Sequence, residues 1–190
     1  MNRPLHLLLL GVMFVAALMP ASTARAASNP DQLNAEAFFD SQQSTVRPGD
    51  PCVRTRVGID AEERFVSGED TLNQVELDIV EFDDCVVDDF GLVAEWYTIA
   101  VVPDNALMID PNLRHARLRA TITACNLVDD DDCRTFDLNV HWKGTGEIEV
   151  DGGSSFREAE AKGRVFDTTF GLNLAPNDAV FASLSRFDNP

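Results

Sequence analysis

Two alternating stretches decide the fold of this chain: residues 116–125 read ARLRATITAC, and residues 136–142 read FDLNVHW. In both stretches every second residue is apolar, and the residues between them are mostly polar. Successive side chains of a strand point to opposite faces, so this alternation predicts strands with one buried and one exposed face. Because a short acidic turn joins them, the two stretches predict a β-hairpin, with Trp142 in its core.

Shorter runs extend the β pattern to both sides of the hairpin. Residues 75–82 alternate up to Ile79 and then change phase, which predicts a bulge near Ile79. Residues 92–102 are apolar on both faces, as expected of a central strand. The other predicted strands are 52–59, 147–150, 157–166, 169–174 and 180–187. About seven to nine short strands in one domain predict an all-β fold, an antiparallel β-sandwich.

The first 26 residues have the features of a Sec-type signal peptide. Arg3 precedes an apolar run over residues 5–19, Pro20 follows it, and Ala24-Arg25-Ala26 fits the preference of signal peptidase. A membrane-spanning helix needs about 20 apolar residues, and this run is shorter. We therefore expect export, either to the medium or to the periplasm and cell envelope, and no membrane span in the mature chain.

After the predicted cleavage site, the composition changes once more. Residues 27–48 are polar and irregular, and we expect a flexible N-terminal segment there, with a short helix after Asn29 as the alternative. Residues 49–190 are long enough for a single β domain with its own core.

The chain is strongly acidic. It contains 32 Asp and Glu against 15 Lys and Arg, a net charge of −17, and loss of the predicted leader removes two cations and makes it −19. Such a surface repels nucleic acid and attracts cations or a basic protein surface. A solubilising acidic coat is the simpler interpretation of the same composition.

The four cysteines all follow the predicted leader. An even number in an exported chain predicts disulfides. Cys125 and Cys133 fall on the outward face of adjacent strands, whereas Cys52 begins one strand and Cys85 ends another. We therefore predict the pairs Cys52–Cys85 and Cys125–Cys133, which stabilise the fold by about 3.8 and about 2.6 kcal/mol on a loop-entropy argument.

Three segments carry a resemblance to other proteins. They are NLRHARLRAT at 112–121, DLNVHWKGTG at 137–146 and FREAEAKG at 156–163. Together they resemble a set of uncharacterised exported bacterial all-β proteins that have a W-x-G-T-G turn and an R-x-A-x-A-x-G strand. The resemblance spans residues 52–167. It implies the β architecture and a bacterial origin, but it implies no activity.

Catalytic motifs are absent from the sequence. His115 and His141 are the histidines after the leader, and there is no G-x-S-x-G, no H-E-x-x-H and no phosphate-binding or dinucleotide-binding glycine loop. The sequence therefore predicts no catalytic residue. A hydrolase that uses carboxylates alone remains open, because the many acids make any pair conceivable.

Two weaker candidates for ligand binding remain. The run Asp129, Asp130, Asp131 and Asp132 could hold calcium, which takes several oxygen ligands from flexible loops. A solvated acidic turn is the simpler interpretation, because consecutive carboxylates cannot all point at one ion.

Trp96 and Tyr97 could belong to a platform that stacks on sugar rings. As neighbours in a strand they point to opposite faces, so at most one of them joins any single platform.

These observations support three hypotheses. The first is an exported, disulfide-stabilised and non-enzymatic β-sandwich that works through surface interactions, without a cofactor. The second is a module that binds carbohydrate or a divalent cation, and an exposed aromatic row would favour it. The third is a carboxylate-based hydrolase, which a pocket with facing acids of perturbed pKa would favour.

Overall fold

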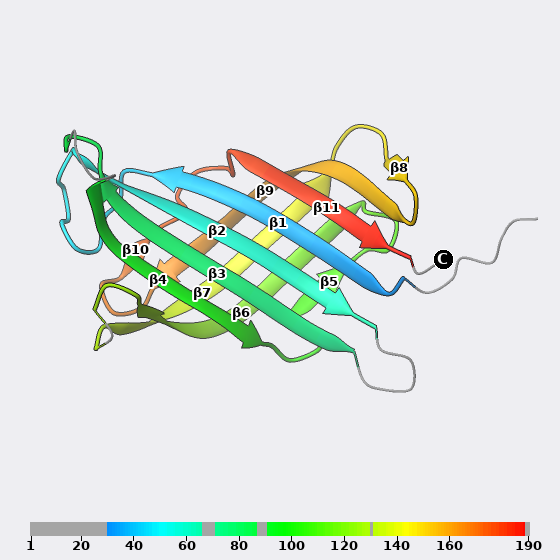
Figure 1. The fold of residues 1–190 in the computed structure, drawn as a ribbon, viewed down its shortest axis with the longest axis horizontal. Helices are drawn as coiled ribbons and strands as arrows, with labels where there is room; N and C mark the ends of the chain where they lie inside the picture. The colour runs from blue at the N-terminus through cyan, green and yellow to red at the C-terminus, as the bar shows by residue number, and fades with distance from the viewer. Residues whose placement is uncertain (1–29, 66–70, 87–90, 130, 189–190) are drawn as a thin grey trace, which may run out of the picture.

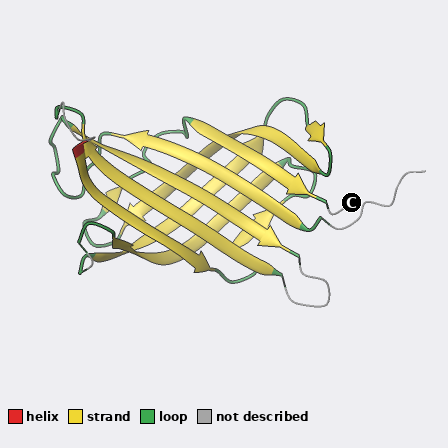
Figure 2. Ribbon diagram, viewed as in Figure 1, coloured by secondary structure: helices red, strands yellow, loops and turns green. Residues whose placement is uncertain are grey.

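The computed structural model describes residues 30–65, 71–86, 91–129 and 131–188, so the predicted signal peptide lies outside the described residues. Strands and their connecting loops make up nearly all of the described chain (Figure 2). The strands are β1 (Gln32–Ser41), β2 (Val53–Arg64), β3 (Leu72–Asp83), β4 (Leu92–Val101), β5 (Leu107–Ile109), β6 (His115–Asn126), β7 (Cys133–Gly144), β8 (Glu149–Asp151), β9 (Ser154–Asp167), β10 (Leu172–Asn173) and β11 (Phe181–Phe187).

One antiparallel sheet closes on itself. Following hydrogen-bonded neighbours, the order is β9, β11, β1, β2, β3, β4, β6 and β7, and β7 pairs again with β9. Figure 1 shows β11 and β1 to β4 in a front layer and β6, β7 and β9 behind it. The predicted all-β antiparallel fold is confirmed, and its two layers are the two sides of one continuous sheet.

Alternate residues of these strands fill the space between the layers. The largest buried side chains are those of Trp96, Trp142, Phe39 and Phe136. Trp142 of β7 donates its indole N–H to the Glu36 carbonyl of β1 at 2.6 Å, which satisfies the polar atom and ties the rear layer to the front one. The predicted core position of Trp142 is confirmed.

Both predicted disulfides are present. Cys125 and Cys133 lie directly opposite each other at the β6–β7 turn, with their Cα atoms 3.9 Å apart. Cys52 precedes β2 and Cys85 follows β3, and because these strands are antiparallel neighbours, the two residues meet. Both links lie at the same end of the closed sheet.

The predicted flexible segment over residues 27–48 is wrong for Gln32–Ser41. These residues form β1, which pairs with β11 on one side and with β2 on the other. Leu33, Ala35, Ala37 and Phe39 are its buried apolar positions. Alanine gives only a weak apolar signal, so this strand depends on its two neighbours more than on its own hydrophobic pattern.

The predicted bulge near Ile79 is also wrong. Val75, Leu77, Ile79 and Glu81 continue in one phase toward the interior, and the register against β4 shifts only between Glu81 and Phe82. Glu81 is fully buried, and its carboxylate accepts hydrogen bonds from both polar groups of Thr45 and from the Ser44 hydroxyl at 2.6–2.7 Å. A carboxylate can occupy this position because the loop after β1 satisfies it.

Strand β4 is not buried on both faces as predicted. It pairs with β3 along its length, but with β6 only through Trp96↔Asn126 and Tyr97↔Cys125. Beyond these pairs the two strands diverge, and Ile99 and Val101 are 52% and 71% exposed on the outer surface. Among the neighbouring strands of the closed sheet, β4 and β6 therefore share the fewest paired residues.

The segments that carry the sequence resemblance meet at the end of the sheet opposite the disulfides. The Arg157 guanidinium donates to the carbonyls of Leu113, Thr145 and Gly146 at 3.0–3.3 Å. A side chain at Gly144 would collide with the Leu113 carbonyl, so glycine is required there. These residues have a structural role in joining β6, β7 and β9.

Candidate functional site

The outer face of the front layer carries a row of carboxylates. Glu36 of β1 lies directly opposite Asp60 of β2, and Asp60 lies directly opposite Glu76 of β3. Side chains at such paired positions have Cβ atoms about 4.5–5.5 Å apart, and like charges there destabilise the sheet. Together with the flanking Glu62 and Asp78, these residues are called the acidic face.

The row lacks compensating cations within the described part of the chain. Glu36 accepts a hydrogen bond from the Ser183 hydroxyl at 3.2 Å, but no described Lys or Arg forms an ion pair with Glu36, Asp60 or Glu76. The Oδ1 atoms of Asp60 and Asp78 are buried without a hydrogen-bond partner. The repulsion within the row is therefore left uncompensated.

This environment changes the acidity of the row. Burial, followed by repulsion from Glu36, Glu76 and Glu62, raises the pKa of Asp60 from 3.8 to about 6. Burial, followed by Glu95 and Glu76, also raises the pKa of Asp78. Both shifts mean that the folded environment makes ionisation of these two carboxylates less favourable than in water.

A shallow open pocket of about 250 Å³ lies over the row. Its lining residues are Glu36, Phe38, Gly58, Ile59, Asp60, Glu76 and Asp78. The half-exposed ring of Phe38 lies over Gly58, where a Cβ would come within 3.3 Å of the ring. Phe181 of β11 lies opposite Phe38 and is also half exposed. The pocket thus combines a carboxylate floor with an aromatic wall, a suitable surface for a cationic group.

We predict that Asp60→Asn stabilises the protein at about pH 8 by about 1–2 kcal/mol. This is less than the free energy that corresponds to the full pKa shift, because partial exposure of Asp60 screens its charge. Since the pKa of Asp60 is higher in the folded state, the folded chain binds more protons between about pH 4 and 6. Its free energy of unfolding therefore falls as pH rises through this window. Urea unfolding of Asp60→Asn and wild type at both ends of the window measures the difference, which should nearly vanish at the acidic end.

The matched control is Asp151→Asn, at an exposed position of β8. It removes the same charge from a site without facing acids and should change stability by less than about 0.5 kcal/mol. Equal stabilisation by both substitutions would attribute the effect to net charge and not to the row.

Trp96 and Tyr97 lie on opposite faces of β4, as expected of neighbours. Trp96 is fully buried, and the Arg134 guanidinium lies 4.1 Å from its ring centroid. Tyr97 is half-buried on the outer face, opposite Asp78. Burial, followed by the carboxylates of Glu76 and Asp78, raises the pKa of the Tyr97 phenol. Tyr97 thus borders the acidic face, whereas Trp96 belongs to the core.

The acidic turn proposed for calcium is partly engaged by the protein itself. Asp132 accepts hydrogen bonds from Arg134 through both carboxylate oxygens at 2.9 and 2.7 Å, and these bonds lower its pKa. The Asp131 N–H approaches the Asp129 carboxylate at 3.4 Å, and Asp130 lies outside the described residues. A calcium site in this turn stays a prediction, with the charge of Asp132 already paired.

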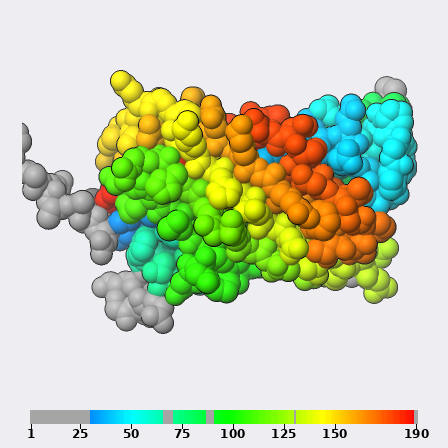
Figure 3. All heavy atoms as spheres, turned by 180° about the vertical axis from the view of Figure 1, so that it is seen from behind, coloured from blue at the N-terminus to red at the C-terminus, as the bar shows by residue number. Residues whose placement is uncertain are grey.

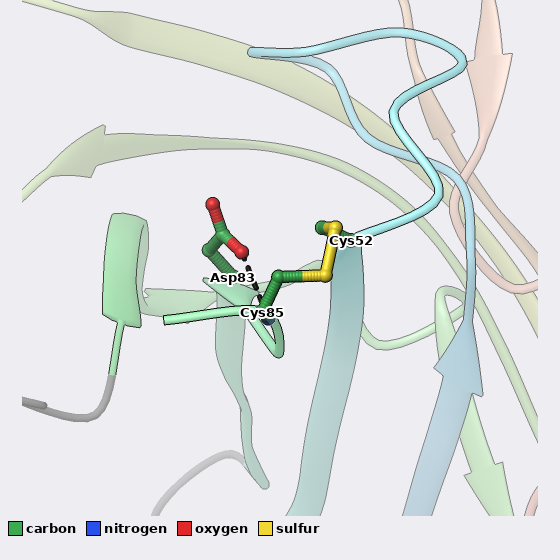
Figure 4. Close-up of side chains that lie close together, drawn as sticks. All are labelled: Cys52, Asp83 and Cys85. Carbon is green, nitrogen blue, oxygen red and sulfur yellow. Dashed lines mark hydrogen bonds between the residues drawn. A yellow bond between two sulfur atoms is a disulfide. The ribbon is translucent and has the colours of Figure 1, made fainter. Parts of the chain in front are cut away.

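Cys52, Asp83 and Cys85 form a second cluster of residue types that can bind metals, but a disulfide accounts for the closeness of the two cysteines. Ligand atoms of Cys52, Asp83 and Cys85 lie within 4.8 Å of one another, but the two sulfurs are bonded to each other (Figure 4). The Asp83 carboxylate accepts the Cys85 N–H at 3.0 Å and pairs with Arg47 at 2.8 Å. This cluster fastens the loop after β1 to the end of β3.

Within the described chain, neither histidine belongs to a recognisable arrangement of catalytic side chains. His115 is exposed, with Nδ1 3.5 Å from the buried carboxylate of Asp110. His141 is exposed on the rear layer. No described serine or cysteine is hydrogen-bonded to either ring, so the pair does not form a nucleophile–base unit.

Comparison of the chain with protein-family models, with curated proteins and with solved structures gives no match. Across residues 30–65, 71–86, 91–129 and 131–188, no helix has the length and apolar character needed to cross a membrane.

Proposed function

We propose that this chain is an exported, non-enzymatic binding protein whose acidic face takes up a basic ligand. The observation that carries the proposal is the row of Glu36, Asp60 and Glu76, three carboxylates in direct register that form no ion pair with any described cation. Each like-charge pair costs a few tenths to about 1 kcal/mol. Proteins tolerate such conflicts chiefly at functional sites, and a cationic ligand would relieve this one.

The size of the row favours a ligand with several cations. Adjacent strands lie about 4.7–4.9 Å apart, so a row across three strands is about 10 Å wide. A calcium ion binds oxygens at about 2.3–2.6 Å and cannot contact both ends of such a row. A peptide segment rich in lysine or arginine can, because its charges are separated by similar distances.

The covalent framework is compatible with the proposed location. Two disulfides link Cys52 to Cys85 and Cys125 to Cys133, and such links persist in oxidising compartments. The N-terminal sequence over residues 1–26 supports export on separate grounds.

We predict that the protein binds decalysine and that Glu36→Gln with Glu76→Gln weakens the affinity at least about tenfold, which corresponds to about 1.4 kcal/mol. Isothermal titration calorimetry at neutral pH and low salt measures both affinities. The control is Glu147→Gln with Glu149→Gln, which makes the same change in net charge at exposed positions near β8. Equal losses in the two variants would reduce binding to a general effect of the acidic surface and defeat the proposal.

A second candidate function rests on the pocket itself. Asp60, with its pKa raised to about 6, lies between Glu36 and Glu76 in an open pocket. A carboxylic acid whose pKa is raised toward neutrality, in a pocket with further carboxylates, is the combination that glycosidases use. Hydrolysis of chromogenic glycosides by the wild type, abolished in Asp60→Asn, would support this function. Equal rates in the two proteins would remove it.

A further inference from the structure

The rear layer carries a row of opposite charge on its outer face. Arg117 of β6 lies opposite His141 of β7, and His141 lies opposite Lys162 of β9. The next outward row along the same strands consists of Arg119, Asn139 and Arg164. The residues Arg117, Arg119, His141, Lys162 and Arg164 are called the basic face.

Most of these side chains make only weak interactions with other described residues. Lys162 pairs with Asp178 at 3.0 Å, but both side chains are about two-thirds exposed, so the pair contributes little. Arg164 stacks on Phe166, and Arg119 donates to Asn139 at 3.3 Å. No ion pair joins a described acid to Arg117 or His141. Among the described residues, acids border the face at Asp137, at Glu160 and at Asp178, the partner of Lys162.

The two charged rows match in geometry. Each crosses three adjacent antiparallel strands at paired positions, so the charges on both faces repeat at the same spacing of about 4.7–4.9 Å. The acidic row belongs to β1, β2 and β3, which lie in the front layer in Figure 1. Figure 3 shows the molecule from behind, where the green, yellow and orange segments of β6, β7 and β9 lie. One molecule cannot neutralise its own rows, because they point in opposite directions.

We propose that the partner of the acidic face is the basic face of a second copy of this chain. The inference rests on the proposed function, since it names the basic ligand of that same face. The contact joins different surfaces on the two copies, so each added copy leaves one acidic and one basic face available. Such head-to-tail contacts extend into open chains unless the rotation between copies closes a ring.

Salt should affect this association in two opposing ways. The net charge of −17 makes copies repel at long range, and that repulsion extends about 30 Å at 0.01 M salt. At physiological ionic strength it is screened beyond about 8 Å, whereas charges in direct contact are screened less. Association should therefore be strongest near physiological salt and weaker at both lower and higher salt. The exposed rings of Phe38 and Phe181 add apolar contact area at the acidic face.

The test uses two complementary charge reversals in the exported chain. The front variant carries Glu36→Lys with Glu76→Lys, and the rear variant carries Arg117→Glu with Lys162→Glu. Each leaves the central residue of its row in place, and in the front variant Asp60 then lies between two lysines. Lys162→Glu places a carboxylate near Asp178, but both positions are about two-thirds exposed, so the added repulsion is small. Thermal unfolding of each variant verifies that it is folded.

Sedimentation velocity over a range of concentrations gives the decisive readout. Wild type should self-associate, and each variant alone should do so at least about tenfold more weakly. A mixture of the two variants should regain association, because the unchanged acidic face of the rear variant meets the unchanged basic face of the front variant, and the two reversed faces also carry opposite charges. A monomeric wild type, or a mixture no more associated than the separate variants, would overturn the inference.

Decalysine binding separates this inference from the proposed function. The rear variant should bind decalysine as wild type does, and the front variant should not. If the rear variant binds decalysine while no protein self-associates, the acidic face keeps its function and only the second copy is excluded. If wild type fails to bind decalysine, the proposed function fails and this inference fails with it.

Discussion

Replacement of Arg134 by alanine is expected to lower the free energy of unfolding by about 3–5 kcal/mol, because it leaves a buried charge without its partner. The Arg134 side chain is almost fully buried, and it lies 3.5 Å from the carboxylate of Asp167, which is completely buried. It also pairs with Asp132 and lies against the rings of Trp96 and Phe170. No other described cation pairs with Asp167, so Arg134→Ala leaves that carboxylate without a counter-ion.

Urea unfolding measures this effect, and the double variant Arg134→Ala with Asp167→Asn tests its cause. Removal of both charges should recover a substantial part of the lost stability, since no unpaired carboxylate is then buried. The control is Arg119→Ala, an exposed arginine of β6, which should cost less than about 0.5 kcal/mol. A loss below about 1 kcal/mol for Arg134→Ala would show that the buried ion pair has little importance.

Removal of the Cys52–Cys85 disulfide is the second large effect. Cys52→Ser with Cys85→Ser should lower the free energy of unfolding by about 3.8 kcal/mol, and Cys125→Ser with Cys133→Ser by about 2.6 kcal/mol. The difference arises because the two links close loops with sequence separations of 33 and 8 residues, and a longer loop loses more entropy in the unfolded chain.

The two disulfide variants serve as controls for each other, because both links lie at the same end of the closed sheet. Chemical unfolding under non-reducing conditions gives both values. A larger loss for the short loop than for the long one would contradict the entropic explanation. It would point to native contacts around Cys125 and Cys133 as the main source of stability.

The hairpin of β6 and β7 and both disulfides were predictable from the sequence for one physical reason. Strict alternation fixes the direction of each side chain, and direction then decides which cysteines can meet. Cys125 and Cys133 occupy outward positions of adjacent strands, and the structure places them opposite each other. Local pattern was sufficient here because the turn between the strands is short.

Other elements depend on contacts that the sequence pattern does not contain. β1 was missed because its buried positions include Ala35 and Ala37, and two neighbouring strands supply the pairing that its weak pattern does not predict. The inward position of Glu81 was missed because a hydrophobic pattern cannot foresee a carboxylate satisfied by the backbone and hydroxyls of a distant loop.

The acidic face was beyond sequence reasoning for the same reason. Glu36, Asp60 and Glu76 are separated widely along the chain, and only the register of three strands places them side by side. The sequence could have indicated only that these residues occupy outward positions in strands with alternating apolar and polar residues. That signal is visible for Asp60 and Glu76 once β2 and β3 are paired, but Glu36 required β1 to be identified as a strand.

The location of a bound basic ligand tests the central claim most directly. Isotope-labelled protein can be titrated with decalysine while backbone amide shifts are followed by NMR. We expect the shifts to concentrate on β1, β2 and β3 around Glu36, Asp60 and Glu76, with little change at the acidic residues near β8. Shifts spread evenly over both regions, or concentrated at residues 129–132, would contradict a binding site on the acidic face.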